Sequence, residues 1–75
     1  MEWTQSEERD GFVEWTRADG YATIRRRQRA DGEWIVRFDR LHQAPAGGGY
    51  HRERAADLDA ATEIIESWKE TDPIE

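Results

Sequence analysis

The chain of 75 residues contains no cysteine, one lysine and two prolines. Without cysteine it can form neither a disulfide nor a zinc site built from thiolates. No apolar run is long enough to cross a membrane, and Met1–Trp3 does not begin a signal peptide, so we expect a soluble, cytoplasmic protein. A domain this small needs large side chains to complete its core, and four Trp, two Phe and two Tyr supply them.

The shortage of lysine gives the charge balance an unusual character. Ten of the eleven basic residues are arginine, Lys69 being the exception, and seventeen residues are acidic, so the formal net charge is −6. An acidic surface with almost no lysine resembles that of proteins from salt-loving archaea, where hydrated carboxylates keep a protein soluble in concentrated salt. A GC-rich genome, which favours codons for Arg, Asp, Glu and Ala, accounts for the same composition, and both explanations can hold.

The strongest structural signal is a β-hairpin predicted over Tyr21–Leu41. Two runs of apolar and arginine residues are joined by Ala30-Asp31-Gly32, and Asp-Gly favours a tight turn because glycine accepts a positive φ. A type I turn with this glycine as the left-handed bulge residue pairs Ile24 with Phe38. A two-residue turn would pair Ile24 with Asp39 and scatter the apolar residues. We therefore predict the bulged register, which gathers on one face Ala22, Ile24, Trp34, Val36 and Phe38.

A first strand is expected before this hairpin. Gly11–Arg17 has the β-propensity of a strand and runs into Arg-Ala-Asp-Gly, the same four letters that recur at Arg29–Gly32. Two identical turns suit an antiparallel meander. The register of the first pair stays open, because a bulged turn places Val13 and Trp15 on the arginine face and a two-residue turn places them on the core face. Residues 1–10 are predicted to be a polar tail, frayed or loosely docked.

The rest of the chain predicts a loop, an edge strand and a helix. His42–Gly49 is rich in Pro and Gly and should be a flexible loop, without the Gly-Lys-Ser/Thr of a phosphate loop. Tyr50–Arg54 is predicted to be a short edge strand. Asp57 is a candidate N-cap for a helix from about Leu58 to Glu70, which ends at Asp72-Pro73. The helix should cover the apolar sheet face with one stripe: Leu58, Ala61, Ile64, Ile65 and Trp68.

These elements predict an α+β fold, a four-stranded antiparallel meander (β-β-β-β-α) with one C-terminal helix packed on one sheet face. The strands should lie near residues 12–17, 21–29, 33–41 and 49–54. One domain is expected over residues 11–71, with residues 72–75 as a C-terminal tail. The most buried residues should be Trp34, Val36, Phe38, Ile24, Leu58, Ile65 and Trp68.

The outline of these elements resembles two known families. A strand, an Asp-Gly turn, the strand EWIVRF, a looped third strand and a helix carrying AATEIIESW are similar, over roughly residues 21–70, to the three-strand-plus-helix domain of plant AP2-type transcription factors and to the arm-binding domain of tyrosine integrases. This resemblance implies DNA binding by an arginine-bearing sheet face. The extra first strand, the glycine loop and the acidic balance depart from it. As a whole, the chain resembles small domain-of-unknown-function proteins of haloarchaea, which implies a habitat and no activity.

The sheet face opposite the helix is the candidate partner or nucleic-acid surface, formed by Tyr21, Arg25, Arg27, Ile35, Arg37 and Leu41. Arginine beside aromatic residues suits phosphate contacts and base stacking. Neighbouring carboxylates can instead neutralise these arginines, and the net charge of −6 opposes the footprint of a nucleic-acid binder. Apolar residues on the same face favour a symmetric dimer, which would bury them. We therefore expect a small non-catalytic interaction protein that forms a homodimer, with a nucleic-acid-binding module as the alternative.

Other kinds of site have little support in the sequence. His42 and His51 have neither helical spacing nor cysteine partners for a metal site. Ser6 and Ser67 lie in no nucleophile motif. The helix carries an outward acidic stripe that is typical of a solvated face: Asp59, Glu63, Glu66 and Glu70. We therefore predict no catalytic, metal or cofactor site, no membrane partner and no small-molecule ligand.

Overall fold

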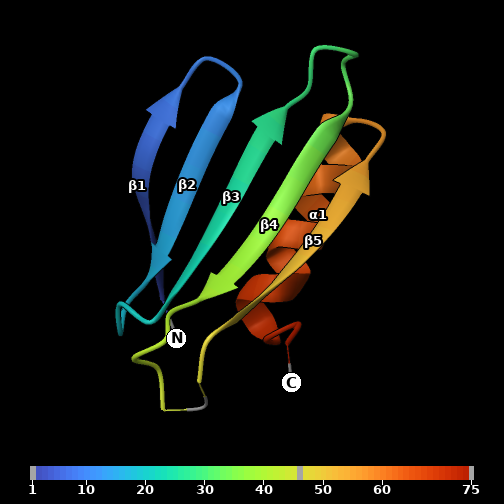
Figure 1. The fold of residues 1–75 in the computed structure, drawn as a ribbon. Coiled ribbons are helices and arrows are strands. Elements are labelled where there is room, and N and C mark those ends of the chain that lie inside the picture. The colour runs from blue at the N-terminus through green and yellow to red at the C-terminus, as the bar shows by residue number, and fades with distance from the viewer. Residues whose placement is uncertain (1, 46, 75) are drawn as a thin grey trace.

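The computed structural model describes residues 2–45 and 47–74. Within them, five strands form one antiparallel sheet in the order β1-β2-β3-β4-β5, followed by a helix, α1 (Figure 1). The predicted α+β meander with a C-terminal helix is confirmed. No helix in this part of the chain has the length and apolar content needed to cross a bilayer. The bounds are Trp3–Arg9 for β1, Phe12–Arg17 for β2, Ala22–Gln28 for β3, Trp34–Arg40 for β4, Gly49–Ala55 for β5 and Leu58–Glu70 for α1.

The N-terminal segment corrects the prediction of four strands after a loosely docked tail. Trp3–Arg9 is a fifth strand at the sheet edge, paired antiparallel with β2. Most residues of this strand are polar, but one side chain anchors it to the core. The half-buried Trp3 packs edge-to-face on the buried Phe38, with ring centroids 6.0 Å apart. A β-bulge between Gln5 and Glu7 interrupts the ladder of this edge strand, which makes it a poorer template for pairing with another chain.

The hairpin of β3 and β4 has the predicted register, with Ile24 opposite Phe38. The turn is closed by two backbone hydrogen bonds, one from the amide of Arg29 to the carbonyl of Glu33 at 2.7 Å and one from the amide of Gly32 to the carbonyl of Arg29 at 3.0 Å. Gly32 has a φ of +90°, a left-handed value that suits glycine and completes the bulge. The bulged turn is therefore confirmed.

The turn between β2 and β3 has the same sequence, Arg-Ala-Asp-Gly, but the two strands pair in a different register. Trp15 pairs with Ile24, so Val13 and Trp15 lie on the core face, as a two-residue turn would place them. The amide of Gly20 bonds to the carbonyl of Arg17 at 2.8 Å, as Gly32 does to Arg29, but the bond from Arg29 to Glu33 has no counterpart here. The carbonyl of Tyr21 accepts the amide of Leu41 on the far side instead, at 2.9 Å. The turn sequence alone therefore does not set the register, because a neighbouring strand competes for the closing carbonyl.

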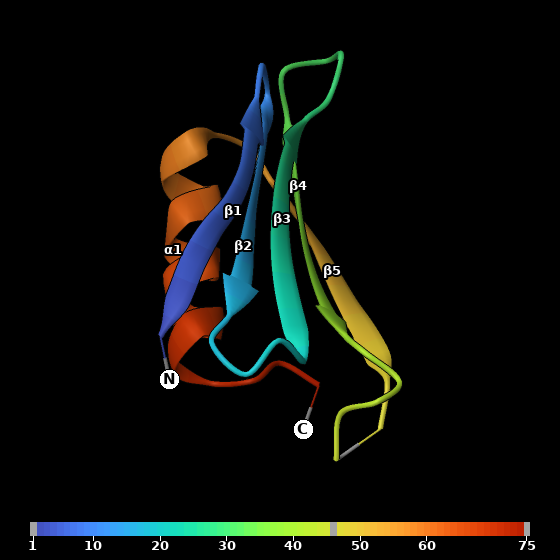
Figure 2. The same ribbon diagram turned by 90° about the vertical axis from the view of Figure 1, so that its left-hand side faces the viewer.

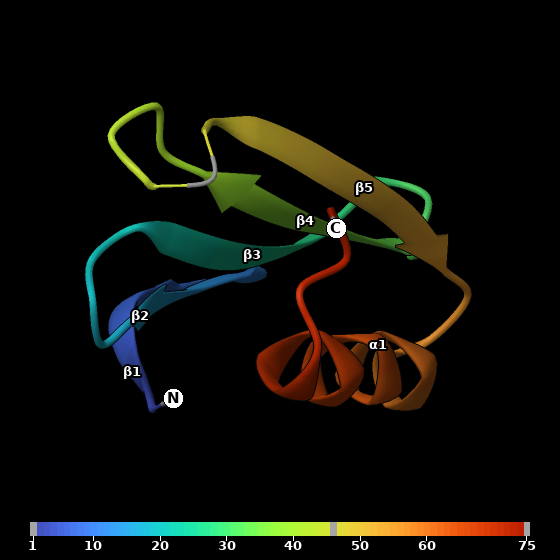
Figure 3. The ribbon, with the colours of Figure 1, turned by 90° about the horizontal axis from the view of Figure 1, so that it is seen from below.

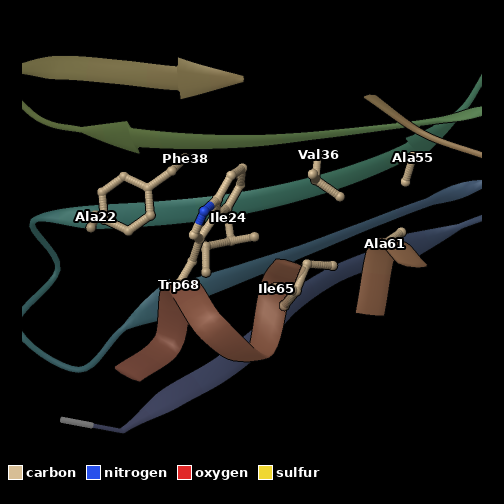
Figure 4. Close-up of a cluster of buried hydrophobic side chains, with 8 residues drawn as sticks. All are labelled: Ala22, Ile24, Val36, Phe38, Ala55, Ala61, Ile65 and Trp68. Atoms are coloured by element: carbon tan, nitrogen blue, oxygen red, sulfur yellow. The ribbon is translucent and has the colours of Figure 1, made fainter. Parts of the chain in front are cut away.

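The helix α1 packs behind β4 and β5 (Figure 1) and lies on one side of the sheet (Figure 2), and β1 and β2 curve round beside it (Figure 3). Asp57 caps the helix as predicted, because its carboxylate accepts the amide of Ala60 at 2.8 Å. Ala61, Ile65 and Trp68 of α1 face the sheet. Figure 4 shows them packed against the side chains of the sheet that complete the core: Ala22, Ile24, Val36, Phe38 and Ala55.

Burial agrees with the predicted core at five of seven positions. Ile24, Val36, Phe38, Ile65 and Trp68 are buried. Trp34 is only half-buried, and Leu58 is 44% exposed, so the prediction for these two is wrong. Leu58 occupies the first position of α1, one turn before the buried stripe begins. The guanidinium of Arg26 lies 5.1 Å from the centre of the Trp34 ring and 5.7 Å from that of the Trp15 ring. Cation–π contacts with an arginine therefore continue the packing beside the apolar core.

The segment after α1 is tied to the sheet by a cluster of charges. Asp72 accepts a hydrogen bond from Arg40 at 3.1 Å and lies 4.0 Å from Arg17. Arg40 also donates to the carbonyl of Gly47 at 2.7 Å. The side chains of Arg40 and Asp72 are only 11% and 13% exposed. This cluster joins the ends of β2 and β4, the loop after β4 and the C-terminal segment.

Candidate binding face of the sheet

The outer face of the sheet, opposite α1, is formed by alternate residues of all five strands. The strand pairing aligns these residues in three rows across the sheet. The first row consists of Thr4, Thr16, Thr23, Asp39 and Tyr50. The middle row consists of Glu7, Glu14, Arg25, Arg37 and Arg52. The third row consists of Arg9, Phe12, Arg27, Ile35 and Arg54.

The outer face has the opposite charge to the chain as a whole. Its three rows contain six arginines and three carboxylates, an excess of three positive charges, whereas the whole chain has a net charge of −6. Charges act mainly over a screening length of about 8–10 Å at moderate salt, so a partner on this face meets the local excess. The net charge of the chain is therefore no argument against an anionic partner here.

Carboxylates hold two arginines of the middle row in place. Arg25 donates from Nε to Glu14 at 2.8 Å and reaches Asp39 at 3.4 Å, and Arg37 donates from Nε to both oxygens of Asp39 at 3.0 Å. The hydrogen bond from Arg25 lowers the pKa of Glu14 below its usual value, and the hydroxyl of Ser6 contributes in the same direction. The neutralisation that the sequence left open is therefore present, and it is centred on these two arginines.

Two other arginines of this face differ from these in having no ion pair with a described residue. Among the ion pairs between described residues, none involves Arg27 or Arg52. Both line a hollow of about 190 Å³ near the middle of the face, together with Phe12, Ile35 and the two neutralised arginines. We call it the arginine hollow. Its apolar residues and cationic walls can accommodate an anionic group next to an apolar one.

A second hollow, of about 440 Å³, lies between the first row and the loop after β4. We call it the tyrosine hollow, after Tyr50, which is 63% exposed. The guanidinium of Arg37 lies 4.5 Å from the centre of the Tyr50 ring, a cation–π arrangement that orients the ring. Leu41, which is 41% exposed, and Thr23 also line this hollow. The two hollows share Arg25 and Arg37 and are therefore adjacent.

The structure brings together most of the residues singled out from the sequence. Arg25, Arg27, Ile35 and Arg37 line the arginine hollow, and Leu41 lines the tyrosine hollow. Tyr21 lines neither of them. It is half-buried in the β2–β3 turn, where its amide bonds to the Asp19 carboxylate at 2.9 Å.

Sequence reasoning missed several residues of the face, and three of them line the hollows: Phe12, Tyr50 and Arg52. Phe12 depends on the β2–β3 register, which the sequence left open. Tyr50 and Arg52 belong to β5, whose charges were interpreted only as protection of an edge. The alternation of Tyr50, Arg52 and Arg54 at period two was the signal that could have placed β5 on this face.

The histidines have separate environments. The ring of His51 pairs with Glu53 at 3.3 Å and meets Trp68 edge-on with centroids 5.6 Å apart, whereas His42 lines the tyrosine hollow. Over residues 2–45 and 47–74, no group of three or more His, Cys, Asp or Glu side chains is placed to hold a metal ion.

Comparison with known proteins identifies a family but no activity. The model of a family of unknown function, DUF7543, matches residues 1–71, and the chain therefore belongs to that family. No curated protein and no solved structure matches the chain. The expected likeness to domain-of-unknown-function proteins is confirmed at this level, and nothing in the comparisons bears on the likeness to AP2-type and integrase domains.

Proposed function

We propose that this member of the DUF7543 family is a non-catalytic, cytoplasmic binding module that holds a nucleic acid strand on the outer face of its sheet. The observation that carries the proposal is the group of six arginines on this face. Arg27 and Arg52, which have no carboxylate partner among the described residues, line one hollow. Arginine binds phosphate through charge-assisted hydrogen bonds, and such contacts supply much of the affinity for nucleic acid.

The neutralised arginines support the same function in a different way. Arg37 uses only its Nε on Asp39 in the hydrogen bonds between described residues, and a guanidinium has five N–H donors. The carboxylates of Glu14 and Asp39 fix the side chains of Arg25 and Arg37, so less conformational entropy is lost when a ligand binds. The face therefore combines two positioned arginines with two that have no carboxylate partner among residues 2–45 and 47–74.

The test is fluorescence anisotropy with a labelled oligonucleotide of about a dozen nucleotides, titrated at several salt concentrations. Arg27→Gln with Arg52→Gln should weaken binding at least ten-fold, because two charge-assisted contacts are lost. The slope of log K against log salt should fall by about 1.4, since each lost phosphate contact on a single strand removes about 0.7.

The matched control is Thr62→Glu with Ser67→Glu. It changes the net charge by the same two units, but at exposed positions of α1. Binding should stay close to that of the original protein, and thermal melts by circular dichroism should show that both double variants fold. The proposal fails if the original protein binds no oligonucleotide from dilute buffer to molar salt, or if the control loses as much affinity as the arginine variant.

Self-association through the same face is the second candidate, and the exposure of Tyr50 and Leu41 favours it. We rank it second because the face has an excess of three positive charges, so two copies brought face to face would repel each other. Ile35→Glu, near the middle of the face, should then produce monomers in light scattering at about 2 M KCl, where charge repulsion is screened. A protein that is already monomeric under these conditions would eliminate this candidate.

A further inference from the structure

Tyr50 has the surroundings of a stacking platform. It lies in β5 opposite Asp39 and is 63% exposed, although aromatic residues usually bury most of their area. The guanidinium of Arg37 lies over the ring at 4.5 Å and limits its movement. An exposed aromatic ring oriented by an arginine is the arrangement on which unpaired bases stack.

One residue that lines the tyrosine hollow has a buried polar atom without a hydrogen-bond partner among the described residues. The hydroxyl oxygen of Thr23 is buried and makes no hydrogen bond to any described residue, and Thr23 lines the hollow. A buried hydroxyl without a partner lowers stability, so its presence calls for an explanation. This oxygen is covered in the free protein, so a ligand that carries donors and acceptors on its edge, as a nucleobase does, would supply the missing bond once the Thr23 side chain rotates toward the hollow.

We infer that the tyrosine hollow is a nucleobase subsite and that the strand bound on the outer face is single-stranded. The two hollows share Arg25 and Arg37, so a phosphate in the arginine hollow places an adjoining base within reach of Tyr50. In a duplex the bases are stacked and paired, and none is free to enter. This inference rests on the proposed function.

The carboxylates of the face favour the same ligand. Glu14 and Asp39 lie among the arginines, each in contact with Arg25. A duplex presents one phosphate charge for about every 1.7 Å of its axis, so a face that binds its backbone should be free of carboxylates. A single strand can turn its bases toward the mixed part of the face and its phosphates toward Arg27 and Arg52.

The experiment compares three labelled probes of equal length: a single strand, an abasic single strand and a duplex. The single strand should bind about ten-fold more tightly than the abasic strand, as one well-stacked base contributes this much, and the duplex should bind more weakly. Tyr50→Ala should lower the affinity for the single strand to the abasic level without changing abasic binding, whereas Tyr50→Phe should retain it. Thr23→Val should weaken single-strand binding while the melting temperature stays the same or rises.

The outcomes separate this inference from the proposed function. Equal binding of the normal and abasic strands, or binding of the duplex at least as tight as that of the single strand, overturns the base subsite. If Arg27→Gln with Arg52→Gln still weakens binding in that case, the proposed function survives. If the original protein binds none of the three probes, both fall. The comparison of probes needs no variant, so it decides the matter even if Tyr50→Ala does not fold.

Discussion

Trp3→Ala should destabilise the protein by about 3 kcal/mol, a large effect for a residue at the start of the chain. A fully buried tryptophan removes about 150–250 Å² from water, and replacing the largely covered Trp3 by alanine, which keeps part of that buried area, returns roughly 100 Å² to water. At about 25 cal/mol per Å² this area contributes about 2.5 kcal/mol. The edge-to-face contact with Phe38, at 6.0 Å between centroids, adds about 0.5–1 kcal/mol. The total stability of a chain this short is only about 4–11 kcal/mol.

Two further variants make the test specific to this contact. Trp3→Phe keeps an aromatic ring beside Phe38, and it removes an indole N–H that is buried without a hydrogen-bond partner among the described residues. It should therefore cost far less than Trp3→Ala. Tyr50→Ala deletes an exposed aromatic side chain from the other edge strand, and it should change the free energy of unfolding by less than about 0.5 kcal/mol.

The measurement is urea unfolding in about 2 M KCl, followed by far-ultraviolet circular dichroism because the variants change the number of tryptophans. The midpoint of Trp3→Ala should fall clearly below that of the other two variants. If Trp3→Ala unfolds within about 0.5 kcal/mol of the original protein, β1 contributes little to stability. Residues 1–10 would then behave as the loosely docked tail that their polar composition predicts.

Three other perturbations test the electrostatics of the fold. Asp72→Asn should cost about 2 kcal/mol in urea unfolding, because a carboxylate that is 13% exposed loses its charge-assisted bond to Arg40, and an unchanged midpoint would show that the cluster is only a surface contact. The pKa of Glu14 is lowered by its hydrogen bond from Arg25, so this pair stabilises the fold above pH 4.5, the ordinary value, and the contribution is lost as the pH falls through the lower folded value. Glu14→Gln should therefore flatten the fall in stability below that pH, and an acid limb of unchanged steepness would contradict the assignment. The melting temperature should rise between dilute buffer and about 2 M KCl, because salt screens the excess of carboxylates, and a flat response would leave codon usage as the reason for the composition.

The charge of the outer face shows why a property of the whole chain can mislead. A net charge of −6 is a sum over all residues, and it predicts a poor nucleic-acid binder. The sheet order places β3, β4 and β5 side by side, so that Arg25, Arg37 and Arg52 form one row. Many of the acidic residues lie on α1 and in the turns instead. The position of each charge depends on which strands are neighbours, and composition contains no such information.

The sequence by itself determined the elements whose signals are local. The register of the β3–β4 hairpin follows from an Asp-Gly turn flanked by residues alternating at period two, and the start of α1 follows from Asp57, whose carboxylate needs only the amide of Ala60. These interactions join residues only a few positions apart, so a short stretch of the sequence includes both partners and is enough to predict the contact.

Tertiary structure decided the features that depend on distant partners. Trp3 makes β1 part of the sheet by packing on Phe38, thirty-five positions away along the chain, and nothing in residues 1–10 indicates that partner. The turn after β2 has the same four letters as the turn after β3, yet its register differs because the carbonyl of Tyr21 bonds to Leu41. The two hollows of the outer face likewise need β5 beside β4, which brings Tyr50 to Arg37. In each case the local sequence is compatible with more than one arrangement, and contacts made across the sheet determine which one forms.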